Sequence, residues 1–328
     1  MHGIIDGDIL SHISASAGEY RYIDVTFPDG SMDTFDNRTA LKEHCNFLDI
    51  PYKECVIEDQ QLPEALSSVI HTAKMILQRW VKEAGVDTYE VVTGFGKGFR
   101  DTLPLPEKYK DRSSATKAVH VDAVKEWILK QPWGYDATQW NIESDDELSI
   151  RAYQGYLKWK KSKKRKDVVV QITTDKDGMG CTGFIFNPDK MSKIKLVEGV
   201  GHLEISKVGN QWKVSGWGTK FLAYQCLCGD NVDSYKPTKH IKKAFGPVKC
   251  YDLIGELDTE AEVWSAVADQ YKEWFGDDHE YTDCFGVTHK VDWLHMMDLY
   301  FKCAYMLRSR DDTRNVKSIL EEIGYEFQ

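Results

Sequence analysis

Four short acidic clusters are the residues of this sequence that could do chemistry together. They are Asp6 with Asp8; Glu143 with Asp145 and Asp146; Asp175 with Asp177; and Asp230 with Asp233. Any single cluster is ordinary, because acidic pairs are common and acidic residues also begin helices. Brought together, the carboxylates would repel one another and need cations, and oxygen ligands of this kind favour Mg²⁺ or Mn²⁺. Two such ions about 4 Å apart can activate a water and stabilise the leaving oxygen of a phosphate ester.

Two of these clusters follow predicted strands directly. The apolar run 3–5 leads into Asp6, and the run 168–172, rich in β-branched residues, leads into Asp175. Because strands alternate with helices before residue 175, we predict an α/β fold with a mainly parallel sheet and helices on both faces. Ligands of such sheets bind outside the carboxyl ends of the strands. The sequence therefore predicts that Asp6 and Asp175 lie at one edge of the sheet.

The rest of the pattern predicts further elements and two regions. We expect a strand at 89–92, a hairpin at 20–36, helices at 64–83, 119–129 and 144–161, an extended piece at 141–142, hairpins within 181–215 and mostly helices from 220. Ser144 is the predicted N-cap of its helix, so that Asp145 and Asp146 fall in the first turn. The predicted domains are an α/β core at 1–218 and a mostly helical region at 219–328 packed on it.

A basic segment at about 96–118 lies between the first two clusters. Its cations are Lys97, Arg100, Lys108, Lys110, Arg112 and Lys117, and Phe99 and Tyr109 lie among them. Spaced cations can neutralise phosphates, and an aromatic ring can stack on an unpaired base. The glycines and prolines of this segment predict a mobile clamp that orders on a polyanion. The alternative is a solvated surface loop.

Bulk composition sets limits on the class of protein. The 328 residues carry a formal charge of −10, so a nucleic-acid-binding face would have to be basic only locally. The eight cysteines include no C-x-x-C pair, which argues against a zinc ribbon. No signal peptide and no apolar run of about 18 residues is visible, so we expect no membrane partner and a cytoplasmic location.

Five motifs, in order, resemble the 5′–3′ exonuclease and flap endonuclease family of bacteriophages, and the similar 5′-nuclease domain of bacterial family A DNA polymerases. The motifs are Ile5-Asp6-Gly7; Phe99-Arg100 with Leu105-Pro106-Glu107-Lys108-Tyr109-Lys110-Asp111-Arg112; Glu143-Ser144-Asp145-Asp146; Thr174-Asp175-Lys176-Asp177; and Leu227-Cys228-Gly229-Asp230-Asn231-Val232-Asp233. They extend over residues 4 to about 254.

This resemblance implies a mixed sheet under a helical arch, a DNA-gripping helical region, and a two-metal nuclease site. The implied first metal site is Asp6, Glu143, Asp145 and Asp146, and the second is Asp175, Asp177, Asp230 and Asp233. Lys110 and Arg112 would act on the scissile phosphate, with Asp145 and Asp146 as the other catalytic residues. The implied substrate-binding residues are Lys97, Arg100, Tyr109 and Lys117. We expect Mg²⁺- or Mn²⁺-dependent cleavage of DNA with a free 5′ end or flap, or of RNA–DNA hybrids, by a monomer in an infected bacterium.

Three positions depart from the family pattern. Thr93 stands where the family has a carboxylate, Lys110 and Arg112 are two rather than three residues apart, and the chain from Ser234 to Pro237 replaces a glycine-rich loop. Other functions therefore stay open. They are a PIN-type RNase, an RNase H-like activity, a catalytically silent nucleic-acid-binding protein, and a magnesium-dependent phosphatase, although the last does not explain residues 99–112.

Overall fold

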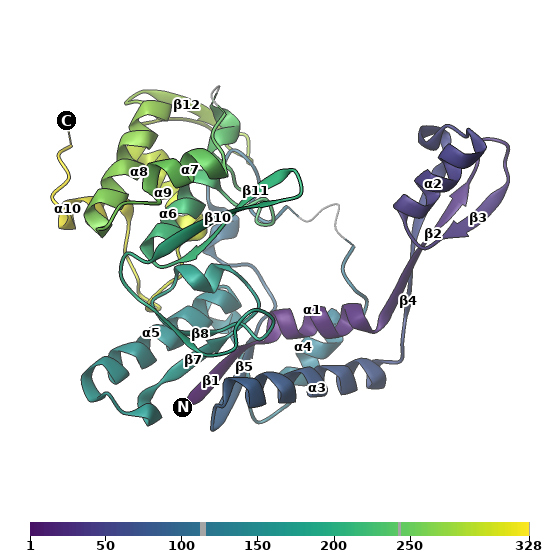
Figure 1. The fold of residues 1–328 in the computed structure, drawn as a ribbon, viewed down its shortest axis with the longest axis horizontal. Helices are drawn as coiled ribbons and strands as arrows, with labels where there is room; N and C mark the ends of the chain where they lie inside the picture. The colour runs from purple at the N-terminus through teal and green to yellow at the C-terminus, as the bar shows by residue number, and fades with distance from the viewer. Residues whose placement is uncertain (112–115, 242–243, 328) are drawn as a thin grey trace. The chain divides into compact units, whose positions relative to one another are not determined.

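The computed structural model describes residues 1–111, 116–241 and 244–327 (Figure 1). The chain forms two compact units. The core unit comprises Met1–Asp6, Trp80–Ala115 and Pro132–Gln328, and the inserted unit comprises Gly7–Arg79 and Thr116–Gln131. The predicted boundary at 218/219 does not coincide with this division, since residues on both sides of it belong to the core unit.

The core unit contains a six-stranded sheet in the order β6-β5-β1-β7-β8-β9. Its strands are β1 (His2–Asp6), β5 (Thr88–Thr93), β6 (Gly134–Asp136), β7 (Val169–Ile172), β8 (Gly183–Phe186) and β9 (Lys195–Val197). All neighbouring strands are parallel except β8 and β9. The predicted mainly parallel sheet flanked by helices is confirmed. Ile4 and Ile5 of β1 are fully buried, as expected for a central parallel strand.

Helix α5 (Ser144–Ser162) packs on this sheet through Leu148 and Ala152, which lie in one apolar cluster with Ile4. Close approach requires Gly155, because an added Cβ would lie 2.4 Å from the Val169 side chain. The predicted extended piece at 141–142 is wrong. Asn141 adopts a left-handed conformation (φ 54°) after a 3₁₀ turn, so the chain bends before the helix.

The C-terminal part of the core unit is mostly helical, as predicted. It contains α6 (Thr219–Cys228), α7 (Pro247–Ile254), α8 (Glu260–Phe275), α9 (Trp293–Ala304) and α10 (Val316–Glu322), with the hairpins β10 (His202–Val208)–β11 (Gln211–Trp217) and β12 (His279–Thr282)–β13 (Thr288–Val291). Its large apolar core includes Val267, Tyr271 and Phe301. In the described part of the chain, no helix is long and apolar enough to cross a bilayer.

The inserted unit combines helices with a small antiparallel sheet in the order β3-β2-β4. Its elements are α1 (Gly7–Ala17), β2 (Glu19–Thr26), β3 (Met32–Phe35), α2 (Arg38–Leu48), β4 (Val56–Pro63), α3 (Leu66–Ala84, whose last residues belong to the core unit) and α4 (Val121–Leu129). The predicted hairpin at 20–36 is confirmed as β2–β3. Helix α2 covers one face of the sheet by packing on Ile23 and Val25.

Short 3₁₀ turns complete the chain. They span Tyr52–Glu54, Phe99–Thr102, Thr138–Trp140, Arg165–Asp167, Asp177–Gly180 and Pro237–His240.

Candidate active site

Asp6 and Asp175 lie at neighbouring strand ends, as predicted. Asp6 is the last residue of β1 and is 1% exposed. Thr173, just past β7, donates its hydroxyl to Asp6 Oδ2 at 2.8 Å and accepts the Asp175 backbone N–H at 3.0 Å. Because the parallel strands β1 and β7 are adjacent, this one threonine links the two acidic clusters.

Asp177 joins this group through the turn that follows β7. Its backbone N–H donates to Asp175 Oδ1 at 3.0 Å. Its own carboxylate accepts a hydrogen bond from the Gln225 side chain of α6 at 2.6 Å. The end of α6 is thereby tied to the carboxyl ends of the strands.

The fourth cluster sits in a tight loop after α6. Gly229 has φ 72°, and an added Cβ would lie 2.2 Å from the carbonyl oxygen of Tyr235. The approach is this close because Asp230 and Tyr235 exchange both backbone hydrogen bonds, at 2.9 and 3.1 Å. Lys176 lies 2.5 Å from Asp230 Oδ2 and so connects this loop to the cluster that follows β7.

Lys110 bridges the start of α5 and the loop after α6. Its ammonium lies 2.7 Å from Glu143 Oε1 and 4.0 Å from Asp233 Oδ2. Its backbone has φ 49°, uncommon for a residue with a side chain, and its N–H donates to the Asp233 carbonyl at 2.8 Å. Such a conformation persists only where the surroundings impose it. Tyr109 donates its hydroxyl to Asp233 Oδ2 at 3.0 Å.

The electrostatics show that the clusters face one another. Burial raises the pKa of Asp145 well above its usual range, and repulsion from Asp6, Asp175 and Glu143 adds to this against the attraction of Lys110. Burial raises the pKa of Asp177 to about 7, with further repulsion from Asp175, and from Asp233 and Asp230.

The same carboxylates stabilise the charged form of the two lysines that contact them. Burial acts to lower the pKa of Lys110, but Glu143 and Asp233 raise it overall. The pKa of Lys176 is likewise raised: burial opposes the rise, and the hydrogen bond and charge of Asp230 cause it.

The site therefore unites seven of the eight predicted metal ligands. They are Asp6, Glu143, Asp145, Asp175, Asp177, Asp230 and Asp233. Within the described ranges, no three His, Cys, Asp or Glu side chains already form a set spaced to hold one ion. The donor chemistry nevertheless fits hard divalent cations, because the carboxylates outnumber the lysines facing them and their mutual repulsion is only partly neutralised.

Asp146 departs from the prediction. It is fully buried, and both of its oxygens accept hydrogen bonds from Arg100, at 2.7 and 2.9 Å. Oδ1 also accepts the Leu307 N–H at 3.1 Å. Neighbouring residues of a helix point in different directions, so Asp145 can face the site while Asp146 faces the interior. Its predicted roles as metal ligand and catalytic residue do not fit this geometry.

Arg100 was predicted to bind substrate, and that prediction is wrong. The side chain is fully buried, and besides Asp146 it contacts Glu143 at 2.9 Å. It also donates to the carbonyl oxygens of Lys302 and Tyr305, at 3.0 and 2.5 Å. A guanidinium with this many partners binds the start of α5 to the end of α9 and leaves no donor for a phosphate.

Residues 96–111 of the basic segment are largely packed rather than a mobile clamp. Leu105 and Tyr109 are 1% and 3% exposed and belong to the apolar core of the helical region. The glycines and prolines did not prevent packing, because these apolar side chains reach that core. Tyr109 is predicted to stack on a base, but it is buried and its hydroxyl is engaged with Asp233.

The other predicted contacts in this segment have different outcomes. Lys97 is exposed, and Lys117 belongs to the inserted unit, where it pairs with Asp122. Arg112 lies outside the described residues. Asp8, also in the inserted unit, pairs with Lys125 at 2.8 Å.

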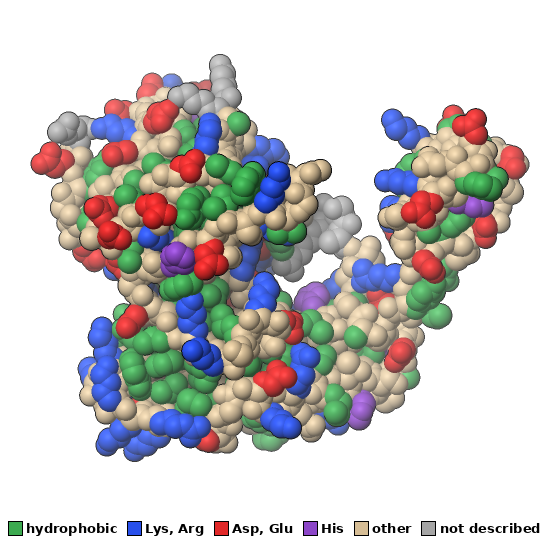
Figure 2. All heavy atoms as spheres, in the orientation of Figure 1, with side chains coloured by type: hydrophobic (Ala, Val, Ile, Leu, Met, Phe, Trp, Pro, Cys, Tyr) green, Lys and Arg blue, Asp and Glu red, His purple; other side chains and the backbone are tan. Residues whose placement is uncertain are grey.

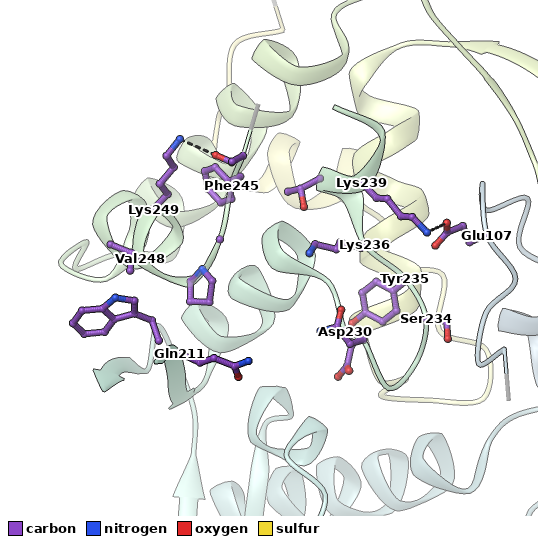
Figure 3. Close-up of a pocket in the computed structure, with 16 residues that line it drawn as sticks. Glu107, Gln211, Asp230, Ser234, Tyr235, Lys236, Lys239, Phe245, Val248 and Lys249 are labelled. Carbon is purple, nitrogen blue, oxygen red and sulfur yellow. Dashed lines mark hydrogen bonds and ion pairs between the residues drawn. The ribbon is translucent and has the colours of Figure 1, made fainter. Parts of the chain in front are cut away.

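An open pocket of about 1070 Å³ adjoins the acidic site (Figure 3). Asp230 lies in its wall, and the other sides come from Glu107, the start of β11, the loop that reaches Lys239, and the start of α7. Lys236, Lys239 and Lys249 line the pocket, as does Trp212, which is 48% exposed. Sequence patterns did not identify these residues, since their common location depends on contacts between four distant segments.

No family model and no curated protein sequence matches this chain. Among the solved structures that match are three of bacteriophage T5 proteins, each at 12% identity over 98% of this chain and 97% of theirs. They are a point mutant of the T5 5′-exonuclease (TM-score 0.42), the T5 D15 protein co-crystallised with metal ions (0.43), and the T5 D15 flap endonuclease in a complex with DNA and metal ions (0.35). At these scores the likeness carries no functional argument, so the proposal below rests on the geometry of the site.

Proposed function

We propose that this protein is a divalent-metal-dependent 5′-nuclease that hydrolyses phosphodiester bonds of DNA. The observation that carries the proposal is that seven carboxylates from four distant segments converge near the carboxyl ends of the strands of the central sheet. Burial, together with their mutual repulsion, raises the pKa of Asp177 to about 7 and that of Asp145 well above its usual range. Buried acids arranged at this cost are characteristic of functional sites, and their oxygen-only chemistry suits Mg²⁺ or Mn²⁺.

We assign the carboxylates to two sets that would each move closer together to bind an ion, because no three of them in the described ranges are already spaced to hold one. Asp6, Glu143 and Asp145 form the first set, without Asp146. Asp175, Asp177, Asp230 and Asp233 form the second. Ions bound there would lower the pKa of a water and stabilise the leaving oxygen of an in-line displacement. Thr93, fully buried at the end of β5, carries a hydroxyl at the position where the family pattern has a carboxylate.

Lys110 is the residue best placed to act on the phosphate. Its ammonium is held among acidic oxygens from two sides of the site, and its left-handed backbone is fixed by the bond to the Asp233 carbonyl. A cation fixed in this way can offset charge that develops on the phosphate in the transition state. Glu143 and Asp233 raise its pKa against the effect of burial, so the carboxylates stabilise the charged form of the ammonium.

The pocket beside Asp230 would receive a nucleic-acid strand. Lys249 donates to the Ala244 carbonyl at 2.7 Å, Lys239 pairs with Glu107, and Lys236 is a third cation of the lining, between the other two in the view of Figure 3. Lysines that neutralise phosphates release condensed counterions, which makes binding strongly dependent on salt. The half-exposed Trp212 offers a ring on which an unpaired base could stack.

The proposal is tested by comparing end-labelled substrates with and without metal. Purified protein is incubated with duplex DNA, a 5′ flap, an RNA–DNA hybrid and single-stranded RNA, in Mg²⁺ or in a chelator. We expect Mg²⁺-dependent cleavage of the DNA substrates that Asp145→Asn abolishes. The control is Asp8→Asn, which removes an acidic charge in the other unit and should leave cleavage unchanged.

The outcomes separate the competing functions. Cleavage of single-stranded RNA alone would favour a PIN-type RNase, and cleavage of the hybrid alone an RNase H-like enzyme. Binding of DNA without cleavage in Mg²⁺ or Mn²⁺ would show a catalytically silent nucleic-acid-binding protein. The missing carboxylate at Thr93, and the pairing of two lysines with Glu143 and Asp230, would then explain the lack of cleavage.

A further inference from the structure

Residues 19–63 of the inserted unit form a small β-sheet module with one covered and one open face. Ile23 and Val25 of β2 face α2 and are buried. Directly paired residues of an antiparallel sheet share a face, so the register defines the opposite one. That open face carries the rows Met32–Thr26–Val56, Thr34–Asp24–Glu58, Tyr22–Gln60 and Tyr20–Leu62.

The open face is apolar at both ends and acidic in the middle. Met32 is 74% exposed and Val56 61% exposed at one end, and Tyr20 and Leu62 are 54% and 61% exposed at the other. Asp24 and Glu58 lie between these ends in register. Exposed apolar side chains gathered on one face are typical of a binding surface.

The module carries a strong excess of negative charge. Residues 19–63 contain ten Asp and Glu against four Lys and Arg, which is most of the formal charge of −10 in the whole chain. Three of those cations already have partners. They are Arg21 with Glu19 at 2.7 Å, Arg38 with Asp59 at 2.7 and 2.8 Å, and Lys42 over the Tyr52 ring at 5.2 Å. Acidic and hydrophobic side chains share its surface in Figure 2. Such a surface repels nucleic acid and attracts a basic polypeptide.

Strand β4 offers the backbone for such a partner. It pairs with β2 over all eight of its residues, and in the described chain its other edge has no neighbouring strand. An unpaired edge is a template for the addition of an extended peptide, with pockets for alternate side chains giving specificity.

We infer that residues 19–63 dock a basic, extended segment of a partner protein, which adds as a strand along β4 and covers the open face. Apolar side chains of the partner would lie on Val56 and Leu62, and a lysine or arginine between them on Glu58. The alternation of a strand fixes the spacing: the two apolar residues are six apart, with the cation two residues from one of them. This surface is independent of the acidic site, and its test does not use cleavage.

The test is a titration of the full-length protein with a fluorescein-labelled octapeptide that has valine at positions 1 and 7, lysine at positions 3 and 5, and threonine elsewhere, so that both kinds of side chain lie on one face of the strand. The matched control for charge is the same octapeptide with glutamate at positions 3 and 5. We expect the lysine peptide alone to bind, with an affinity that falls as salt is added, and to protect the amides of residues 56–62 from hydrogen exchange. Glu58→Lys, and separately Val56→Ser with Leu62→Ser, should weaken binding at least about tenfold, which corresponds to about 1.4 kcal/mol.

The control variant is Phe47→Ser on α2, because Phe47 is 83% exposed yet lies outside the open face. It should leave the affinity unchanged. The inference is overturned if the lysine peptide does not bind at millimolar concentration, if the glutamate peptide binds equally, or if Phe47→Ser weakens binding as much as Glu58→Lys. The inference is also overturned if a single-stranded oligonucleotide displaces the lysine peptide and Glu58→Lys changes the affinity for that oligonucleotide. That result would assign the open face to nucleic acid.

Discussion

Replacing Arg100 by methionine should destabilise the core unit by about 3–5 kcal/mol, the usual cost of removing one partner of a buried ion pair. Methionine retains much of the side chain's length and apolar contact, so the loss reports on charge and hydrogen bonds. The guanidinium is fully buried and donates to Asp146, Glu143 and two backbone carbonyl oxygens. Its removal leaves a buried carboxylate without its cation and two carbonyls without their donor.

A double-mutant cycle separates the pair from its surroundings. Asp146→Leu alone should also destabilise the protein, because it leaves the Arg100 charge buried with Glu143 as its remaining acidic partner. The combination Arg100→Met with Asp146→Leu should be more stable than the sum of the two losses predicts, by at least about 1 kcal/mol, since contacting residues are not additive. The free energies come from urea unfolding followed by tryptophan fluorescence, with Lys53→Met, at an exposed position of the inserted unit, as the control. A loss below about 1 kcal/mol for Arg100→Met would refute the structural role and restore Arg100 as a candidate for substrate contact.

Three further perturbations have defined outcomes. The folded-state pKa of Asp177 is raised to about 7 from an ordinary 3.8, so the folded protein binds this proton more tightly than the unfolded chain does. In a chelator, the free energy of unfolding should therefore fall as pH rises from about 4 to 7. The slope of melting temperature against pH should be smaller in Asp177→Asn. Gly229→Ala should lower the free energy of unfolding, measured by thermal unfolding, by at least about 1–3 kcal/mol, because its backbone (φ 72°, ψ −171°) suits glycine alone. The control Gly209→Ala should lower it less, because nothing lies within 4 Å of an added Cβ there. Lys110→Ala should lower the single-turnover cleavage rate more than DNA affinity, and the reverse pattern, or the same effect from the exposed Lys108→Ala, would contradict a role in the transition state.

The sequence predicted the parts of the site that depend on local pattern. Asp6 and Asp175 follow apolar strands, and parallel strands bring their carboxyl ends to one edge whatever the rest of the chain does. The helix after Ser144 and the glycine before Asp230 were equally visible, because a capping residue and a tight turn are properties of a few adjacent residues. These features were sufficient to predict the convergence of the acidic clusters.

Local sequence pattern could not predict which side chains contact residues that are distant in the sequence. Arg100 and Tyr109 were taken for surface residues because cations and aromatic rings interleave there. Their burial depends on the carbonyl oxygens of Lys302 and Tyr305 and on the side chain of Asp233, more than 120 residues away. The pairing of β4 with β2 in the inserted unit was missed for the same reason, since β4 does not follow β2 in a simple hairpin.

The acidic start of α5 shows how one motif serves two purposes. Asp145 and Asp146 are adjacent, and a helix turns about 100° between neighbours, so their side chains can face different sides. Asp146 is neutralised inside the core by Arg100, whereas Asp145 remains among Asp6, Asp175 and Glu143 with Lys110 as the attracting charge. The basic segment thus supplies both cations, Arg100 at one end for the interior and Lys110 at the other for the site. Because Glu143 contacts both, the position of the site depends on the buried pair, and loss of Arg100 should impair metal binding as well as stability.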